Sequence, residues 1–196
     1  MNTPNKLTLA RMIATPIFMA TMLIDFPYHY TVSLILFAAA SLTDMIDGKL
    51  ARKYNMVTDF GKFLDPLADK MLTTAAYLGF MFIYCAKCGS YGIQITAIVF
   101  IVLFREFMVS SLRLVTAKSG LVVAANIWGK LKTVSQMVGL VAALSFYAVI
   151  NDFGFAAIQG ICDTIILVLF WISAALCVIS GLIYLNECKS YINTSK

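Results

Sequence analysis

Six long apolar runs, separated by short polar connections, recur along the whole sequence. Crossing about 30 Å of hydrocarbon takes roughly 20 mostly apolar residues in a helix, and each run comes within a few residues of that length. None alternates in the two-residue period of an outer-membrane barrel strand. The pattern predicts a single all-α integral membrane domain over residues 1–196. Its six transmembrane helices are expected over residues 7–24, 31–51, 66–84, 93–114, 132–150 and 161–185.

The lysines and arginines gather on one side of these predicted spans. Thirteen of the fifteen fall in the N-terminal segment, the second and fourth connections and the C-terminal segment. Lys87 lies on the opposite side, and Arg105 lies inside the fourth span. Cytoplasmic connections carry the excess of basic residues in membrane proteins. Both termini are therefore expected in the cytoplasm, in a multi-pass protein of the plasma membrane.

The composition agrees with a membrane protein. Hydrophobic residues make up 61% of the chain and charged residues 13%, whereas soluble domains carry roughly 25% charged residues. The net charge of +5 falls mainly on the predicted cytoplasmic face, where it suits anionic lipid headgroups or phosphorylated substrates. Nothing in the sequence indicates nucleic-acid binding, because it has no basic tail and no aromatic stacking surface on a soluble domain.

The five cysteines include one C-x-x-C pair, Cys85 and Cys88. A redox pair or half of a zinc site is the functional interpretation, but a structural zinc site needs two further ligands. The sole histidine, His29, has no partner motif. Because free cysteine packs as a small apolar residue, we interpret these cysteines as packing residues.

Half of the ten acidic residues lie in one stretch, DMIDGKLARKYNMVTDFGKFLDPLADK, residues 44–70. At 100° per residue, Asp44 and Asp47 are about 60° apart on a helix that is expected to continue to about Lys53. We expect Pro66 to open the third helix, so that Asp65 lies in its first turn and Asp69 lies one turn deeper on the same face. Two antiparallel neighbours could then bring the four carboxylates together.

The four carboxylates predict a metal site. Like charges repel, and an ionised aspartate inside the membrane boundary costs at least about 2.5 kcal/mol. Aspartates with no histidine or cysteine among them suit hard divalent cations, and two such ions about 4 Å apart can polarise a phosphoryl group. The predicted cofactors are two divalent cations, Mg²⁺ or Mn²⁺. Their predicted ligands are Asp44, Asp47, Asp65 and Asp69.

Small residues and one arginine accompany these aspartates. Gly48, Ala51 and Gly61 leave room for a bulky ligand against the helix backbones, and Arg52 could hold a phosphate bidentately. The alternative is a solvated, charged helix end. That alternative stays open for Asp59, for which no role follows from the sequence.

Together these positions form the pattern D-x2-D-G-x2-A-R-x8-G-x3-D-x3-D, which matches in full the motif of the CDP-alcohol phosphotransferase family, membrane enzymes of phospholipid synthesis. The resemblance implies a six-helix bundle, usually a homodimer, with a binuclear metal site at the cytoplasmic boundary. It implies that Asp69 contacts metal and also acts as the general base. A hydroxyl would attack the β-phosphorus of a CDP-linked donor, and CMP would leave. The implied cytidine diphosphate pocket consists of Gly48, Ala51, Arg52 and Gly61.

A second charged segment, REFMVSSLRLVTAKSGLVVAANIWGKLKTVSQ, covers residues 105–136. An arginine inside a span is by default a functional-site hypothesis. Arg105 and Arg113 are about 80° apart on a helix, and with Lys130 they predict a positive pocket for an acceptor that carries phosphate. This segment and the opening PNKLTLARMIATP resemble the bacterial phosphatidylglycerophosphate synthase branch of the family. That resemblance implies CDP-diacylglycerol as the donor and glycerol 3-phosphate as the acceptor.

Other interpretations remain open. Lys118, Lys130 and Lys132 could only orient the chain in the membrane, and Arg105 could form an intramembrane ion pair with Glu106 or another carboxylate. A family member could use phosphatidylglycerol, inositol phosphate or serine as the acceptor. An ion-coupled transporter also needs intramembrane charges, but it would spread them through the membrane depth, whereas here the carboxylates crowd one end. A structural scaffold would not explain the aspartate spacing.

Overall fold

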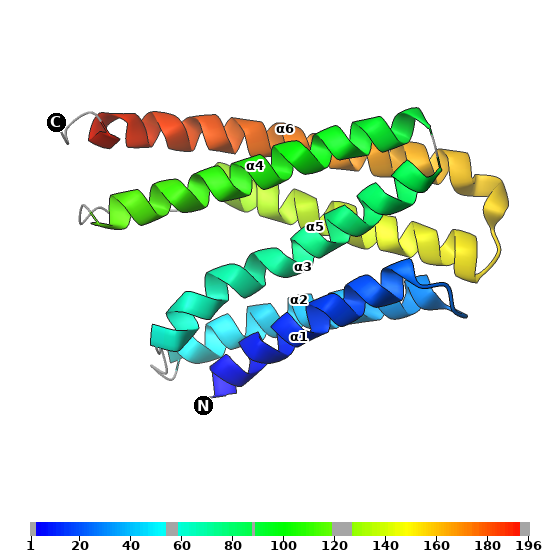
Figure 1. The fold of residues 1–196 in the computed structure, drawn as a ribbon, viewed down its shortest axis with the longest axis horizontal. Coiled ribbons are helices and arrows are strands. Elements are labelled where there is room, and N and C mark those ends of the chain that lie inside the picture. The colour runs from blue at the N-terminus through cyan, green and yellow to red at the C-terminus, as the bar shows by residue number, and fades with distance from the viewer. Residues whose placement is uncertain (1–2, 54–58, 88, 119–126, 193–196) are drawn as a thin grey trace. The chain divides into compact units, whose positions relative to one another are not determined.

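The computed structural model describes residues 3–53, 59–87, 89–118 and 127–192. Within these ranges, the side chains of residues 3–4, 44–53, 59–63, 65–66, 69, 115, 117–118 and 190–192 are outside the description. The described backbone contains helices and no strand (Figure 1). The α-helices are α1 (Thr3–Leu23), α2 (His29–Lys53), α3 (Asp59–Ala86), α4 (Ser90–Lys118), α5 (Ile127–Tyr147) and α6 (Gln159–Ile192). A π-helical turn, η1 (Ala148–Asp152), and a 3₁₀ turn, η2 (Ala156–Ile158), connect α5 to α6.

Four helical segments in the described part of the chain are long and apolar enough to cross a membrane, namely Asn5–Leu23, Ser90–Leu114, Ile127–Asp152 and Ala156–Lys189. The apolar parts of α2 and α3 are shorter, over His29–Thr43 and Lys70–Ala86. These bounds refer to the described side chains, which leave out residues 44–53 of α2 and residues 59–63, 65–66 and 69 of α3. The all-helical prediction is confirmed, and the count of six spans stays a prediction.

The two helices that carry the acidic stretch differ in how well they were predicted. α2 ends at Lys53, as expected, but α3 begins at Asp59 and not at Pro66. Asp65 and Asp69 therefore lie about two and three turns into α3. Proline is favoured at the first position of a helix because its missing N–H needs no partner there. The preference does not exclude an interior proline, which gives up one backbone hydrogen bond, here to the carbonyl of Lys62.

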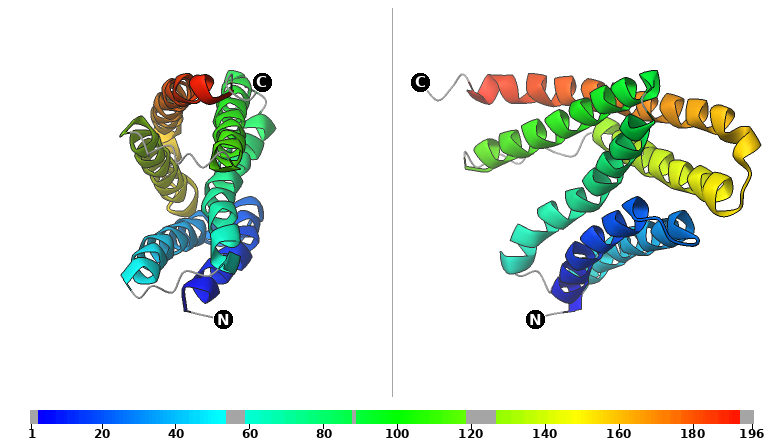
Figure 2. Two further views of the ribbon diagram at one scale, coloured as in Figure 1. Left: turned by 90° about the vertical axis from the view of Figure 1, so that its left-hand side faces the viewer. Right: turned by 45° about the vertical axis from the view of Figure 1, so that its right-hand side comes forward.

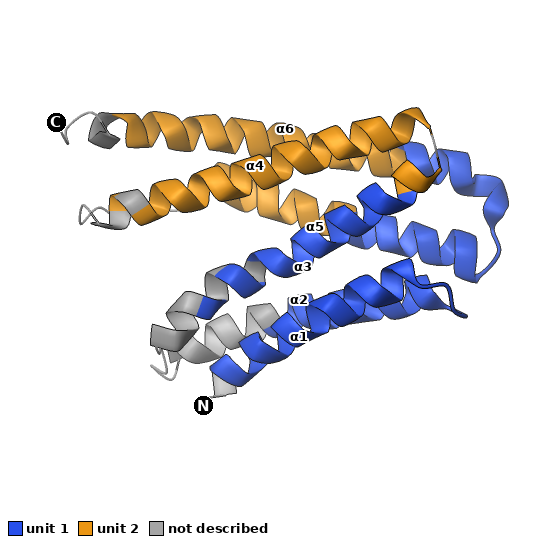
Figure 3. Ribbon diagram, viewed as in Figure 1, with its two compact units in different colours: residues 1–83, 140–164 blue, residues 84–139, 165–196 orange. Residues whose placement is uncertain are grey.

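The chain forms two compact units, which we describe separately (Figure 3). Unit 1 comprises Met1–Ile83 and Leu140–Thr164. In it, α1 and α2 lie side by side (Figures 1 and 2). Phe18 of α1 packs on Phe37 of α2 with ring centroids 5.6 Å apart, and the hydroxyl oxygens of Thr21 and Ser33 lie 3.0 Å apart. The two helices therefore share an apolar contact and a partly buried polar contact.

The start of α2 is also tied to the turn that follows α5. The Oδ2 atom of Asp152 accepts hydrogen bonds from the backbone N–H of Thr31 at 2.6 Å and from its hydroxyl at 2.7 Å. The first N–H groups of a helix have no partner inside the helix. Asp152 supplies a partner for one of these N–H groups, that of Thr31, from a position 121 residues away in the sequence.

Unit 2 comprises Tyr84–Gly139 and Ile165–Lys196. Its helical parts are the last residues of α3, all of α4, the first part of α5 and most of α6. A Cβ atom at Gly139 of α5 would lie 3.4 Å from the ring of Phe170 on α6. α4 and α6 are joined by the hydrogen bond from Trp171 Nε1 to Gln94 Oε1, 3.2 Å long. Large apolar side chains such as Phe100, Phe104 and Phe107 stay exposed, as expected of surfaces that face lipid.

Candidate active site

The eight motif positions lie on two consecutive helices of unit 1. α2 carries Asp44, Asp47, Gly48, Ala51 and Arg52, and α3 carries Gly61, Asp65 and Asp69. The side chains at these eight positions are outside the description, so the structure gives their register along the backbone only. The roles predicted for them remain predictions.

The register is compatible with two pairs of carboxylates. Because α2 runs without a break to Lys53, the spacing of Asp44 and Asp47 puts them about 60° apart on one helix. Asp65 and Asp69 are four residues apart in α3, a spacing that places side chains on the same face. The chain from the last residue of α2 to the first of α3 can span at most roughly 20 Å. The end of one helix and the start of the next therefore have to stay close.

The donor chemistry of this set fits divalent cations. Four carboxylates provide only oxygen ligands, which Mg²⁺ and Mn²⁺ prefer. Among the described side chains, which do not include these four, there is no group of three or more that could hold a metal ion. The acidic stretch is therefore the place where the sequence and the backbone register support a metal site.

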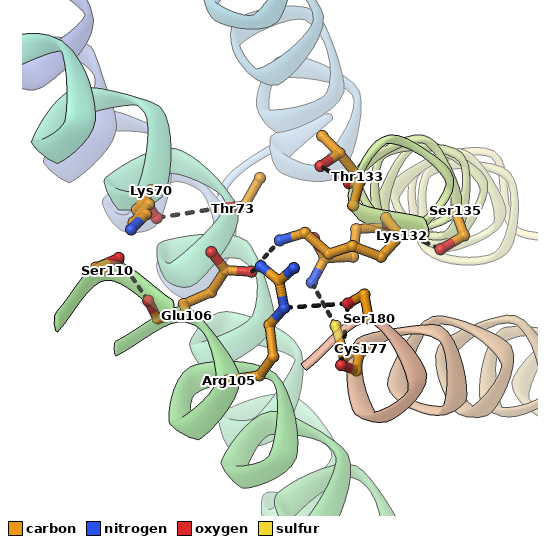
Figure 4. A network of polar contacts seen from close by, with 12 residues as sticks. Lys70, Thr73, Arg105, Glu106, Ser110, Lys132, Thr133, Ser135, Cys177 and Ser180 are labelled. Atoms are coloured by element: carbon orange, nitrogen blue, oxygen red, sulfur yellow. Dashed lines mark hydrogen bonds and ion pairs between the residues drawn. The ribbon is translucent and has the colours of Figure 1, made fainter. Parts of the chain in front are cut away.

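In the second charged segment, the side chains around Arg105 are described and lie within unit 2 (Figure 4). The Arg105 guanidinium donates from Nε to the hydroxyl of Ser180 at 3.2 Å. Its Nη1 lies 3.5 Å from Oε1 of Glu106, and the ammonium of Lys132 pairs with the same carboxylate oxygen. The side chains of these three ionisable residues are only 11%, 15% and 8% exposed. α4, α5 and α6 each supply a member of the cluster.

Two cations therefore share one carboxylate inside this cluster. If all three residues are ionised, their charges sum to +1. A buried positive charge is costly unless an anion compensates it. The cluster therefore favours a nearby anion, and Lys132 contributes to this charge balance as much as Arg105 does.

The structure separates the three residues predicted to bind the acceptor phosphate. Arg105 is buried in the cluster, and its predicted alternative role, an ion pair with Glu106, is present. Arg113 is exposed, with its Cζ atom 5.8 Å from the ring centroid of Tyr184. Lys130 is exposed in the first turn of α5. Among the described side chains of unit 2, no hydrogen bond or ion pair joins Arg113 or Lys130 directly to the Arg105 cluster, so the common pocket stays a prediction.

The sequence alone assigns no functional role to Lys132, Ser180 or Tyr184. Lys132 was interpreted only as a residue that orients the chain. Ser180 and Tyr184 lie in a predominantly apolar span, and a polar residue inside a span is a usable signal for a functional or packing role. Their partners on α4 lie far away in the sequence and could not be identified from it.

The C-x-x-C pair is described in part. The thiol of Cys85 is free and exposed, and its Sγ lies 3.5 Å from the hydroxyl oxygen of Thr96. Cys88 lies outside the described residues. The free cysteines Cys162, Cys177 and Cys188 are buried. Burial of these three agrees with the interpretation of cysteines as packing residues.

Comparison with known proteins identifies the family. The profile of the CDP-alcohol phosphatidyltransferase family matches residues 1–179. A protein of Bacillus subtilis (strain 168) is 38% identical over 208 residues, which cover 99% of this chain and 98% of that protein. A protein of Rickettsia bellii is 38% identical over 190 residues, 97% of each chain. A protein of Salmonella typhimurium is 39% identical over 141 residues, 71% of this chain and 74% of that protein.

All three relatives carry the name CDP-diacylglycerol–glycerol-3-phosphate 3-phosphatidyltransferase. The family match covers all eight motif positions and the three ionisable residues of the cluster, Arg105, Glu106 and Lys132. With the aspartate motif on α2 and α3, these similarities show that the chain belongs to the CDP-alcohol phosphatidyltransferase family.

Proposed function

We propose that this protein transfers the phosphatidyl group of CDP-diacylglycerol to glycerol 3-phosphate, which yields phosphatidylglycerol phosphate and CMP. The observation that carries the proposal is the complete aspartate motif on consecutive helices α2 and α3. Relatives that match nearly the whole chain and are named for this donor and acceptor support the choice of substrates.

The reaction needs a base and compensation for the charge of the diphosphate. Asp44, Asp47, Asp65 and Asp69 would hold two divalent cations, which would supply positive charge to neutralise the diphosphate and polarise the β-phosphorus. Asp69 accepts the proton of the acceptor hydroxyl. The acceptor oxygen forms a bond to the β-phosphorus, the bond from that phosphorus to the CMP oxygen breaks, and no covalent enzyme intermediate is needed.

The donor pocket uses the other motif positions. Gly48, Ala51 and Gly61 have small or no side chains, so that the cytidine diphosphate can approach the backbones of α2 and α3. Arg52 lies beside the carboxylates in the sequence and binds a phosphate of the donor through its planar guanidinium.

The acceptor phosphate binds to Arg105, Arg113 and Lys130. In support, Arg105 belongs to a buried cluster that contains two cations and one carboxylate, which favours an anion nearby. The exposure of Arg113 and Lys130 leaves both cations accessible to a water-soluble substrate. Lys132 supports this site through its ion pair with Glu106.

The membrane arrangement follows from the same proposal. The chain forms one domain of six spans with both termini in the cytoplasm, and it acts as a homodimer in the plasma membrane of a bacterium. The distribution of lysine and arginine supports the orientation, and the bacterial relatives support the location. The active site then faces the cytoplasm, where glycerol 3-phosphate is available.

Release of CMP from CDP-diacylglycerol tests the function. Purified protein in detergent micelles with Mg²⁺ or Mn²⁺ is given glycerol 3-phosphate, phosphatidylglycerol, inositol phosphate or serine in separate reactions. We expect release with glycerol 3-phosphate and little with the others. Equal release with another acceptor would contradict the acceptor assignment. Asp69→Asn should remove the activity, and Asp25→Asn, at a fully exposed aspartate, should keep it.

A further inference from the structure

The exposed guanidinium of Arg113 on α4 lies over the ring of Tyr184 on α6. The Arg113 Cζ atom is 5.8 Å from the ring centroid, within the range of about 6 Å over which an aromatic ring attracts a cation. Tyr184 itself is buried, with 6% of its surface exposed. A long, solvent-accessible cation thus rests on a ring that belongs to the core of unit 2.

The core fixes this ring in place. Tyr184 packs with Val109 and Cys188, and the partly buried Met108 and Leu112 border the cluster. The Tyr184 hydroxyl is buried and has no hydrogen-bond partner among the described residues. A buried hydroxyl without a partner lowers stability, so the hydroxyl gives no reason for a tyrosine here. The contact with Arg113 is made by the aromatic ring, which is therefore the part of this side chain that the structure uses.

One face of α6 holds both arginines of α4. Ser180 accepts the hydrogen bond from Arg105, and Tyr184 lies four residues later, on the same face of α6. The Cα atoms of Arg105 and Arg113 are eight residues, or about 12 Å, apart along α4. Helical side chains lean towards the N-terminus of their helix. Arg113 therefore leans along α4 towards the level of Arg105, with the Tyr184 ring under its guanidinium.

We propose that Tyr184 is a positioning residue that holds Arg113 for the phosphate of the acceptor. This inference rests on the proposed function. A free arginine side chain loses much conformational freedom when it binds a phosphate, and a guanidinium already held on a ring loses less. The effect of Tyr184 appears in the KM for glycerol 3-phosphate and depends on the presence of Arg113. The KM for CDP-diacylglycerol does not change.

A double-mutant cycle tests the role of Tyr184. Tyr184→Leu removes the ring and is expected to raise the KM for glycerol 3-phosphate about two- to fivefold. Tyr184→Phe keeps the ring and the wild-type KM, and it should melt at a higher temperature because it lacks the unpaired hydroxyl. In an Arg113→Ala background, Tyr184→Leu should cause no further increase in KM. If Tyr184→Leu does not fold, Tyr184→Met takes its place in the cycle.

Val109→Ala is the matched control, because it removes volume from the same cluster and leaves the ring. Its effect on stability should be similar in the presence and absence of Arg113, with the KM for glycerol 3-phosphate unchanged. The inference is overturned if Tyr184→Leu raises this KM equally with and without Arg113. It is also overturned if Tyr184→Phe raises the KM for glycerol 3-phosphate as much as Tyr184→Leu does. Absence of turnover in the wild type contradicts the proposed function, whereas additive effects in an active enzyme contradict only the role of Tyr184.

Discussion

Lys132 of α5 and Glu106 of α4 form a largely buried ion pair that joins two helices of unit 2. Arg105 approaches the same carboxylate oxygen at 3.5 Å. The pair therefore does more than connect two helices, since its carboxylate lies between two cations. Removal of the carboxylate would leave both cations in a site with little access to water.

Glu106→Gln is expected to lower the free energy of unfolding by about 3–5 kcal/mol, the cost of breaking a buried ion pair on one side. Adding Lys132→Met should recover part of the loss, because one of the two unpaired cations is then gone. Thermal melting in detergent micelles measures both variants. Glu187→Gln, at an exposed glutamate of α6, is the control. Equal melting temperatures for Glu106→Gln and Glu187→Gln would contradict a stabilising role of the Glu106 carboxylate.

Gly181→Ala is expected to disturb Arg105. A Cβ atom at Gly181 would lie 3.3 Å from Cγ of Arg105 and 3.2 Å from Cε of Met108, so these side chains would have to shift by a few tenths of an ångström. Because catalysis depends steeply on the placement of binding groups, we expect kcat/KM for glycerol 3-phosphate to fall roughly three- to tenfold.

Gly160→Ala is the matched control for this substitution. Gly160 lies in the same helix, and no atom lies within 4 Å of the position of its Cβ. The alanine should keep the activity and raise stability by about 0.5–1 kcal/mol, because glycine loses more backbone freedom in a helix. If the two alanine variants were equally active, the absence of a side chain at Gly181 would not be needed to place Arg105.

Asp152→Ala should destabilise unit 1 without a direct effect on substrate binding. The variant loses two hydrogen bonds to Thr31 at the start of α2, which is comparable to the loss of a helix cap, about 1–2 kcal/mol. Asp25→Ala removes a fully exposed carboxylate nearby in the sequence and should change the melting temperature little. The cap assignment fails if the two variants melt alike.

Removal of divalent cations should abolish CMP release, and Mg²⁺ or Mn²⁺ should restore it. Binding of Mn²⁺, followed by its electron paramagnetic resonance signal, gives a readout apart from activity. We expect two ions per chain in the wild type and weaker binding in Asp44→Asn. Asp59→Asn, in the same stretch but outside the predicted ligand set, should bind Mn²⁺ normally. Full activity with excess chelator would contradict the metal site.

The sequence was a good guide to local features. The apolar runs predicted the helices, and the helical pattern from Asp44 to Lys53 predicted the late end of α2. The predicted start of α3 was wrong, because Pro66 was assigned to the first position of a helix that begins at Asp59. The placement of proline is a preference set by one missing N–H, and it did not decide the boundary here.

Contacts between distant residues were harder to predict. Glu106 and Lys132 are 26 residues apart, and Arg105 and Ser180 are 75 apart. Helical periodicity tells which residues share a face of one helix, but not which helices pack together or at what level. For this reason the aspartate motif could be assigned from spacing, whereas Lys132 and Tyr184 required the structure.

The most direct test of the proposed reaction follows the acceptor into the lipid. Glycerol 3-phosphate labelled with ¹³C is incubated with CDP-diacylglycerol, divalent cation and purified protein, and the products are measured by mass spectrometry. We predict labelled phosphatidylglycerol phosphate that contains the intact glycerol phosphate, formed in equal amount to CMP. CMP without a labelled lipid, or a lipid product without the label, would contradict phosphatidyl transfer to glycerol 3-phosphate.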